Sequence, residues 1–177
     1  MRRIPALIAA VLLAVCCGKD DPGYSSQVTD INKYIDSQLE DHPEYTVERD
    51  GDIARLTVVQ GEGAAVNGDG LVKLFYAGYR FTGSISASNL FATNQEDVAR
   101  SAGWQLTGVD YENGVVLDLS DKSILEGLRK GLKGVKPGEE CYILFPARYG
   151  NGNKVAGTIP AGSALVYRIW VIDIENE

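Results

Sequence analysis

The chain has 177 residues, enough for one domain with a sizeable core and short extensions. Hydrophobic residues make up 45% of it and charged residues 23%, a balance typical of a globular protein and not of a disordered one. The formal net charge of -7 argues against nucleic acid as a partner, because such a chain has no basic excess to neutralise phosphates.

The few cysteines and the single histidine limit the kinds of metal site and catalytic site that the chain can form. There are three cysteines and one histidine. Cys16 and Cys17 end an apolar leader, so Cys141 is the single thiol of the body and is expected to be a small buried side chain of a strand. His42 precedes Pro43 in a segment that reads as a linker. The sequence therefore predicts no metal site and no cofactor, and it gives little support to a Ser-His-Asp triad.

The first 17 residues have the pattern of a lipoprotein signal peptide. A basic start at Arg2 and Arg3 precedes a mostly apolar run over residues 4–15, which is shorter than the roughly 20 residues that span a bilayer. A cysteine directly after such a run resembles the bacterial lipobox, so Cys16 and Cys17 are both candidates for lipidation. An ordinary cleaved signal is the alternative. We expect an outer-membrane lipoprotein of the cell envelope, held to the membrane by its N-terminal lipid and facing either the periplasm or the surface.

Residues 18–44 are predicted to form an acidic tether and an amphipathic helix. The segment around Asp20 and Asp21 resembles the tethers of Bacteroidetes-type lipoproteins. Over residues 28–39 the apolar side chains recur at helical spacing, and the pattern ends before Pro43. This helix either packs on the following domain or acts as a spacer.

Residues 45–177 are predicted to form one domain. Strands are expected over 45–49 and 53–59, joined by a hairpin turn at Gly51, then over 71–81, 141–145 and 164–174. A glycine-rich turn region covers 61–70, and a short helix is expected over 123–131. One short helix among five or six antiparallel strands indicates an α+β fold with the helix laid across the sheet.

Five short motifs follow one another along this domain. They are Phe75-Tyr76-Ala77-Gly78, Leu90-Phe91, Ile124-Leu125-Glu126-Gly127-Leu128, Tyr149-Gly150, and the run from Ile159-Pro160 to Tyr167. In order and spacing they resemble the FKBP-type peptidyl-prolyl cis-trans isomerase family, over roughly residues 53–174. The resemblance implies an FKBP-like fold, in which a curved antiparallel sheet of five to six strands wraps on one short helix, with the N-terminal helix added.

The resemblance also implies a proline-binding pocket, a folding assistant for envelope or secreted proteins, and proline-containing polypeptides as partners. The residues carried over as catalytic are Tyr76, Phe91, Tyr149 and Tyr167. Those carried over as substrate-binding are Val115, Ile124, Leu125, Leu128 and Ile159. In this reading the Tyr149 phenol holds the peptide and the backbone N–H of Leu125 binds a substrate carbonyl, with no nucleophile, metal or cofactor.

Three departures from the family pattern keep other functions open. The acidic residue that follows the pocket phenylalanine is Ala92 here, and Leu128 stands where many members have tryptophan. An insertion between Phe91 and Val115 carries Trp104. One alternative is a non-catalytic FKBP-like lipoprotein that binds a peptide or protein. A second is a surface glycan-binding or structural lipoprotein, with Trp104 as its aromatic platform.

Overall fold

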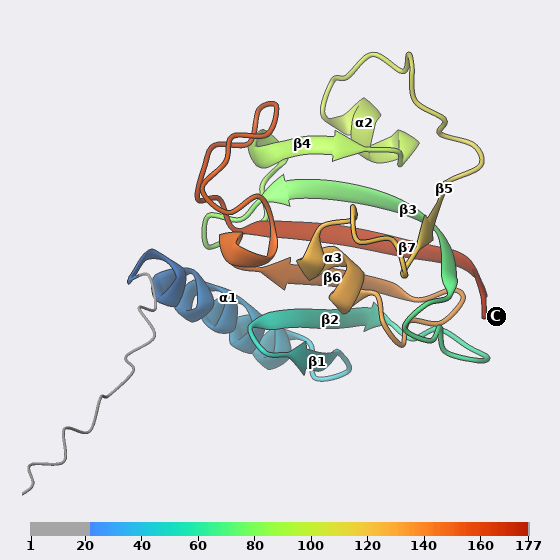
Figure 1. Cartoon of the computed structure of the whole chain (residues 1–177), viewed down its shortest axis with the longest axis horizontal. Helices are drawn as coiled ribbons and strands as arrows, with labels where there is room; N and C mark the ends of the chain where they lie inside the picture. Colours follow the sequence, from blue (N-terminus) through green and yellow to red (C-terminus); the bar gives the residue numbers. More distant parts are fainter. Residues whose placement is uncertain (1–21, 177) are drawn as a thin grey trace, which may run out of the picture.

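The computed structural model describes residues 22–176 (Figure 1). The predictions for residues 1–17, including lipidation of Cys16 or Cys17, lie outside the described residues. Within 22–176, no helix is both long enough and apolar enough to cross a membrane.

A seven-stranded antiparallel sheet forms the centre of the molecule. Its order is β1-β2-β6-β7-β3-β4, and β5 pairs with a further part of β3. The strands are β1 (Thr46–Asp50), β2 (Ile53–Val59), β3 (Leu71–Arg80), β4 (Leu90–Thr93), β5 (Val115–Asp118), β6 (Glu140–Phe145) and β7 (Leu165–Glu175). The α+β fold with an N-terminal helix is as predicted, but the sheet exceeds the expected five to six strands. The strands without an individual prediction, β4 and β5, have only four residues each, too few to show a clear alternation.

Three α-helices and two short 3-10 turns accompany the sheet. They are α1 (Pro22–Asp41), η1 (Ala87–Asn89), α2 (Glu96–Ser101), α3 (Glu126–Gly131) and η2 (Ala147–Tyr149). Helix α3 is shorter than the predicted 123–131 because Leu125, at its N-cap, has ψ 130° and lies outside the helical region. Helix α2 belongs to the insertion, for which no helix was predicted.

Helix α3 packs very closely on one face of the sheet. Gly127 and Gly131 are four residues apart, so both lie on the same side of the helix. A Cβ at Gly127 would lie 2.3 Å from the Phe145 ring, and one at Gly131 would lie 2.2 Å from Ile143 Cγ2. These two positions therefore need glycine, and the close approach lets Leu128 reach the main core.

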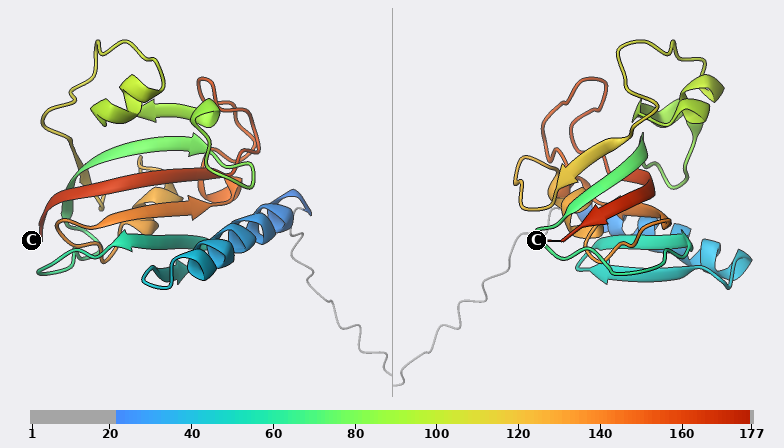
Figure 2. Two further views of the ribbon diagram at one scale, coloured as in Figure 1. Left: turned by 180° about the vertical axis from the view of Figure 1, so that it is seen from behind. Right: turned by 90° about the vertical axis from the view of Figure 1, so that its right-hand side faces the viewer.

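Helix α1 packs on the opposite face of the sheet. Its Ile31 and Ile35 are buried in a second core, together with Leu144 of β6, whereas the neighbouring Ile143 belongs to the core under α3. Because successive side chains of a strand point to opposite faces, the two helices lie on opposite sides (Figure 2). Gln27 adds a tie at one end, where its amide donates to the Gly162 carbonyl at 2.7 Å. The N-terminal helix thus packs on the domain and is not a spacer.

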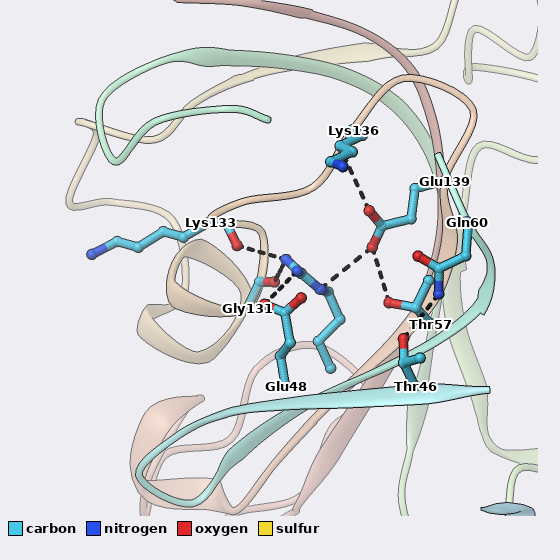
Figure 3. A network of polar contacts seen from close by, with 9 residues as sticks. Thr46, Glu48, Thr57, Gln60, Gly131, Lys133, Lys136 and Glu139 are labelled. Atoms are coloured by element: carbon cyan, nitrogen blue, oxygen red, sulfur yellow. Dashed lines mark hydrogen bonds and ion pairs between the residues drawn. The ribbon is translucent and has the colours of Figure 1, made fainter. Parts of the chain in front are cut away.

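A buried ion pair joins the sheet to the turn after α3 (Figure 3). Arg55 of β2 is only 4% exposed, and its Nη1 donates to the carbonyls of Gly131 at 3.2 Å and Lys133 at 2.6 Å. Its Nε lies 3.4 Å from Oε1 of the equally buried Glu139, and its Nη2 lies 2.7 Å from Glu48. Since the carbonyls at the end of a helix lack partners within the helix, Arg55 fixes the C-terminal end of α3.

Candidate functional site

A cavity of about 250 Å³ lies between α3 and the face of the sheet that α3 covers. Its walls come from β3, β4, β5, β7 and α3. They are lined by Leu74, Tyr76, Ala92, Val115, Leu117, Leu128, Tyr167 and Ile169. The lining is apolar apart from two phenol groups. Drug-sized ligands need about 300–1,000 Å³, so this pocket suits a single small side chain or ring.

Tyr167 forms the rigid wall of the cavity. Its ring lies nearly parallel to that of Phe145, with an interplanar angle of 13° and centroids 6.1 Å apart. The ring of Phe91 meets it edge-on at 5.7 Å and 82°, and the Tyr76 ring lies 6.3 Å away. Three aromatic neighbours therefore hold the Tyr167 side chain in one orientation.

Two phenol groups of this cavity have no protein partner. Neither Tyr76 nor Tyr167 donates its hydroxyl to any residue within 22–176, and neither hydroxyl is sealed from the cavity. Burial raises the pKa of Tyr167, and burial together with the nearby Tyr111 raises the pKa of Tyr76. Both groups therefore stay protonated at neutral pH and are free to donate a hydrogen bond to a ligand.

A polar clamp fixes the backbone beside Tyr76. The Thr93 hydroxyl donates to the Tyr76 carbonyl at 2.7 Å, and the Asn94 carbonyl oxygen accepts from the Tyr76 N–H at 2.6 Å. Both side chains are buried, and the Asn94 amide also donates to the Leu74 carbonyl at 3.4 Å. The side chains of the last residue of β4 and of the residue after it thus hold β3 at Tyr76, which orients the pocket tyrosine.

The predicted pocket residues come together, but not all of them line the cavity. Tyr76, Val115, Leu128 and Tyr167 line it. The other five pack around the same core and are absent from the lining: Phe91, Ile124, Leu125, Tyr149 and Ile159. The backbone N–H of Leu125 has no hydrogen-bond partner in the described part of the chain, as a group that binds substrate requires.

Tyr149 lies away from the cavity, at the end of η2. Its hydroxyl is 3.4 Å from where a Cβ of Gly51 would stand, so the phenol points to the turn between β1 and β2. Lys130 Nζ and Arg148 Cζ lie 5.5 and 5.0 Å from its ring centroid. That Tyr149 holds a substrate stays a prediction. Its position means that any contact of Tyr149 with a substrate would lie outside this cavity.

Several residues of the cavity were not predicted. Leu74, Leu117 and Ile169 each lie two residues from a predicted residue on the same strand, so period-2 alternation would have found them. The clamp of Thr93 and Asn94 carries no such signal, because its partners are backbone groups of another strand.

The insertion places Trp104 at the surface, after α2. Its side chain is 38% exposed, and its backbone N–H donates to the Ala99 carbonyl at 2.9 Å. Within residues 22–176, no group of three or more His, Cys, Asp or Glu side chains could hold a metal ion. Cys141 is fully buried in β6, which confirms that part of the sequence analysis.

Comparison with known proteins identifies relatives of this arrangement. Residues 62–172 match the family model of FKBP-type peptidyl-prolyl cis-trans isomerases. FK506-binding protein 1 of Aspergillus oryzae is 25% identical over 122 residues, 69% of this chain and 97% of that protein. The peptidyl-prolyl cis-trans isomerase FkpA of Buchnera aphidicola subsp. Schizaphis graminum is 33% identical over 66 residues, 37% of this chain but only 26% of that protein.

The solved structures agree with these relatives on the fold. The crystal structure of a peptidyl-prolyl cis-trans isomerase from Pseudomonas syringae pv. tomato is similar with a TM-score of 0.57 and 18% identity. The match covers 89% of this chain and 99% of that chain. The fold predicted from the five motifs is thereby confirmed.

Proposed function

Because the chain belongs to the FKBP-type peptidyl-prolyl cis-trans isomerase family, whose homologues are peptidyl-prolyl cis-trans isomerases, we propose that it isomerises prolyl bonds of envelope or secreted polypeptides. The observation that carries the proposal is the cavity of about 250 Å³ beside the locked ring of Tyr167. It is sized for a pyrrolidine ring and sits within the matched residues.

Prolyl isomerisation is a rotation about one bond, so the protein needs no nucleophile and no acid or base to catalyse it. Rotation of a prolyl amide is slow because it breaks the resonance of the peptide bond, at a barrier of about 18–20 kcal/mol. The planar amide is strongly polar, whereas the twisted amide has lost much of its charge separation and costs less to desolvate. An apolar cavity therefore binds the twisted form better than the planar form, which is the requirement for catalysis.

The two free phenols give the cavity a further means of favouring the twisted amide. In a planar amide the nitrogen lone pair is delocalised, but in the twisted amide it can accept a hydrogen bond. Tyr167 offers a protonated hydroxyl on a ring that cannot turn away, and Tyr76 offers a second. We assign the donor role to Tyr167, because its ring is the more deeply buried and has three aromatic neighbours.

The proposal is tested by a refolding reaction limited by proline isomerisation, with the full-length protein as catalyst. Ala92→Phe would fill the cavity without removing a contact, since Ala92 lines it. Ala161→Phe, at an exposed turn, is the matched control. We expect acceleration by the wild type and by the control, and none by Ala92→Phe. A folded wild type that gives no acceleration would contradict the enzyme and favour the non-catalytic peptide-binding protein.

We place the protein at the outer membrane as a lipoprotein, on the evidence of the leader sequence alone. Labelling of growing cells with an alkyne-tagged fatty acid, followed by membrane fractionation, tests this. We expect label on the wild type and its loss in Cys16→Ser or Cys17→Ser, depending on which thiol is acylated. Labelling of neither wild type nor variants would leave an ordinary cleaved signal as the explanation.

A further inference from the structure

A second cavity lies on the opposite face of the sheet from the prolyl cavity. It has a volume of about 360 Å³ and lies between α2 of the insertion and strands β3, β4 and β7. Its polar and aromatic wall is made by Tyr79, Gln95, Asp97, Ser101, Arg168 and Trp170. Small apolar side chains of η1, β4 and α2 complete it. The two cavities share no lining residue.

The floor of this cavity offers side chains and no backbone groups. Strand β7 is paired on both sides, with β3 and β6, and β3 is paired with β7 on one side and with β4 and β5 on the other. The two strands of the floor therefore offer no free edge, and among the strands that line the cavity only β4, at the end of the sheet, has one. At the floor, recognition must come from side-chain donors and acceptors and from Trp170.

Tyr79 brings a hydroxyl without a protein partner to the cavity. The residue as a whole is only 8% exposed, but its hydroxyl is open to the cavity and makes no hydrogen bond to any of the residues 22–176. Burial raises the pKa of Tyr79, so this group stays a neutral donor and acceptor. A ligand with a hydroxyl group of its own would satisfy it.

The rim of the cavity adds further hydrogen-bond donors and acceptors that have no protein partner. Asp97 has two carboxylate oxygens without a partner among the described residues, and the Ser101 hydroxyl is likewise free. Gln95 uses its oxygen to accept from the Val98 N–H at 3.1 Å, which fixes the side chain and leaves its amide N–H₂ available. The rim thus offers free donors and free acceptors beside an apolar side of the cavity.

The charge of the cavity is balanced. Arg168 Nε donates to Glu140 Oε1 at 2.7 Å, and its guanidinium lies 4.6 Å over the Trp170 ring. The pairing neutralises Arg168 and leaves its Nη1 without a protein partner, as a donor for the cavity. With the free carboxylate of Asp97 nearby, an anionic ligand is disfavoured.

We propose that this outer cavity is a binding site for a neutral saccharide of one or two rings. A sugar ring carries hydroxyls that each donate and accept, as Tyr79, Asp97, Gln95 and Arg168 require, and its C–H groups can contact the part of the Trp170 indole that lines the cavity. The site would let the protein hold a glycan or a glycosylated chain independently of the prolyl cavity.

The test titrates the full-length protein with maltose, cellobiose, lactose and N,N′-diacetylchitobiose, and follows the two indole N–H signals by NMR. The protein has two tryptophans, so Trp104 is the internal reference for Trp170. We expect at least one of these sugars to shift the Trp170 signal saturably. Asp97→Ala and Tyr79→Phe should each weaken that binding about tenfold, which is about 1.4 kcal/mol. Asp110→Ala, an exposed acid of the same insertion, should bind like the wild type.

Three outcomes would overturn the proposal. They are the absence of a saturable shift for all four sugars, a shift of Trp104 in place of Trp170, and wild-type affinity in both Asp97→Ala and Tyr79→Phe. A proline-containing peptide that shifts Trp170 with no effect of the sugars would assign the cavity to a polypeptide instead. The rate of proline-limited refolding, measured with and without sugar, should not change. The two proposals can therefore fail separately.

Discussion

The ring of Phe91 occupies the space that the missing side chain of Gly78 leaves open. A Cβ at Gly78 would lie 2.7 Å from two ring carbons of Phe91 and 3.0 Å from Tyr167 Cε1. Gly78 is buried in β3 and has an ordinary negative φ, so the requirement for glycine is spatial and not conformational. The aromatic wall of the cavity beside α3 thus depends on a residue that contributes no side chain to it.

Gly78→Ala should therefore damage both stability and activity. The added methyl group must displace the Phe91 ring or the Tyr167 ring, and overpacking of this kind costs about 1–3 kcal/mol. Urea denaturation should show that loss in the free energy of unfolding, and proline-limited refolding should show a reduced rate. Gly68→Ala is the control, since its Cβ would meet only Lys133 at 3.8 Å. Equal stability of the two variants would mean that Phe91 is free to move.

Tyr167→Phe separates the hydroxyl from the ring. The ring packing against Phe145 is kept, and the hydroxyl that is removed has no protein partner, so the free energy of unfolding should change little. If the hydroxyl donates to the twisted amide, kcat falls about tenfold with little change in KM, because the lost interaction exists only in the transition state. Steady-state kinetics on a proline-containing peptide measure the two constants.

Tyr149→Phe is the matched comparison for that experiment. Its phenol lies outside the cavity, near Gly51, so any contact with the substrate would be the same in the planar and twisted forms. A higher KM with an unchanged kcat is expected. If Tyr167→Phe shows this pattern too, the hydroxyl of Tyr167 binds the peptide and takes no part in favouring the twisted amide.

The sequence predicted the central elements because their patterns are long. Strand β3 has ten residues and β7 has eleven, and both were found to within about one residue of their ends. Four of the nine predicted pocket residues line the cavity, and they come from β3, β5, α3 and β7, which packing brings together. These four residues could be predicted because the order of the motifs along the chain indicates the topology, and the topology places distant segments side by side.

The other parts of the fold and of the site could not be predicted, because they depend on contacts between distant residues that leave no local sequence pattern. The clamp of Thr93 and Asn94 bonds to backbone atoms of Tyr76 and Leu74, which any residue could supply. The outer cavity exists because α2 of the insertion and β7, about seventy residues further along the chain, supply two of its walls. Arg55 reads as an ordinary polar position of a strand, and only the folded chain shows it to be buried.

The pair of Arg55 and Glu139 should contribute much more to stability than the exposed ion pairs. Both side chains are at most 5% exposed, so removing the Glu139 charge leaves the buried Arg55 with only one carboxylate partner, the exposed Glu48. Glu139→Gln is expected to lower the free energy of unfolding by about 3 kcal/mol, as for other broken buried pairs. Glu96→Gln breaks the pair of Glu96 with Arg100, two exposed side chains, and should cost about 0.5 kcal/mol or less.

A double-mutant cycle distinguishes a charge effect from a general loss of packing. Arg55→Met combined with Glu139→Leu removes both charges, and the double variant should be more stable than either single variant. Costs that simply add would show that the two side chains act separately, with Arg55 serving only as the cap of α3. Chemical denaturation of the four proteins gives the coupling energy.

The free energy of unfolding should fall at alkaline pH, first because of Cys141 and at higher pH also because of the buried tyrosines. Burial raises the pKa of the Cys141 thiol well above its ordinary 9.0, so in the folded state it keeps a proton that the unfolded chain loses. The folded state then binds more protons, and its stability falls as pH rises through about 9, by up to about 1.4 kcal/mol per pH unit. The raised pKa values of Tyr34, about 12, and of Tyr167 steepen the loss above pH 10.

The slope of stability against pH tests this assignment better than stability itself. Cys141→Ala removes the titrating thiol, so the free energy of unfolding should fall less steeply with pH between about 8 and 10 than it does in the wild type, whatever its absolute value. Val116→Ala, an exposed and uncharged change, should keep the wild-type slope. A thiol reagent such as Ellman's should react with this cysteine only at the rate of unfolding, because the buried thiol gives no thiolate in the folded chain. An unchanged slope in Cys141→Ala would assign the alkaline loss to the tyrosines alone.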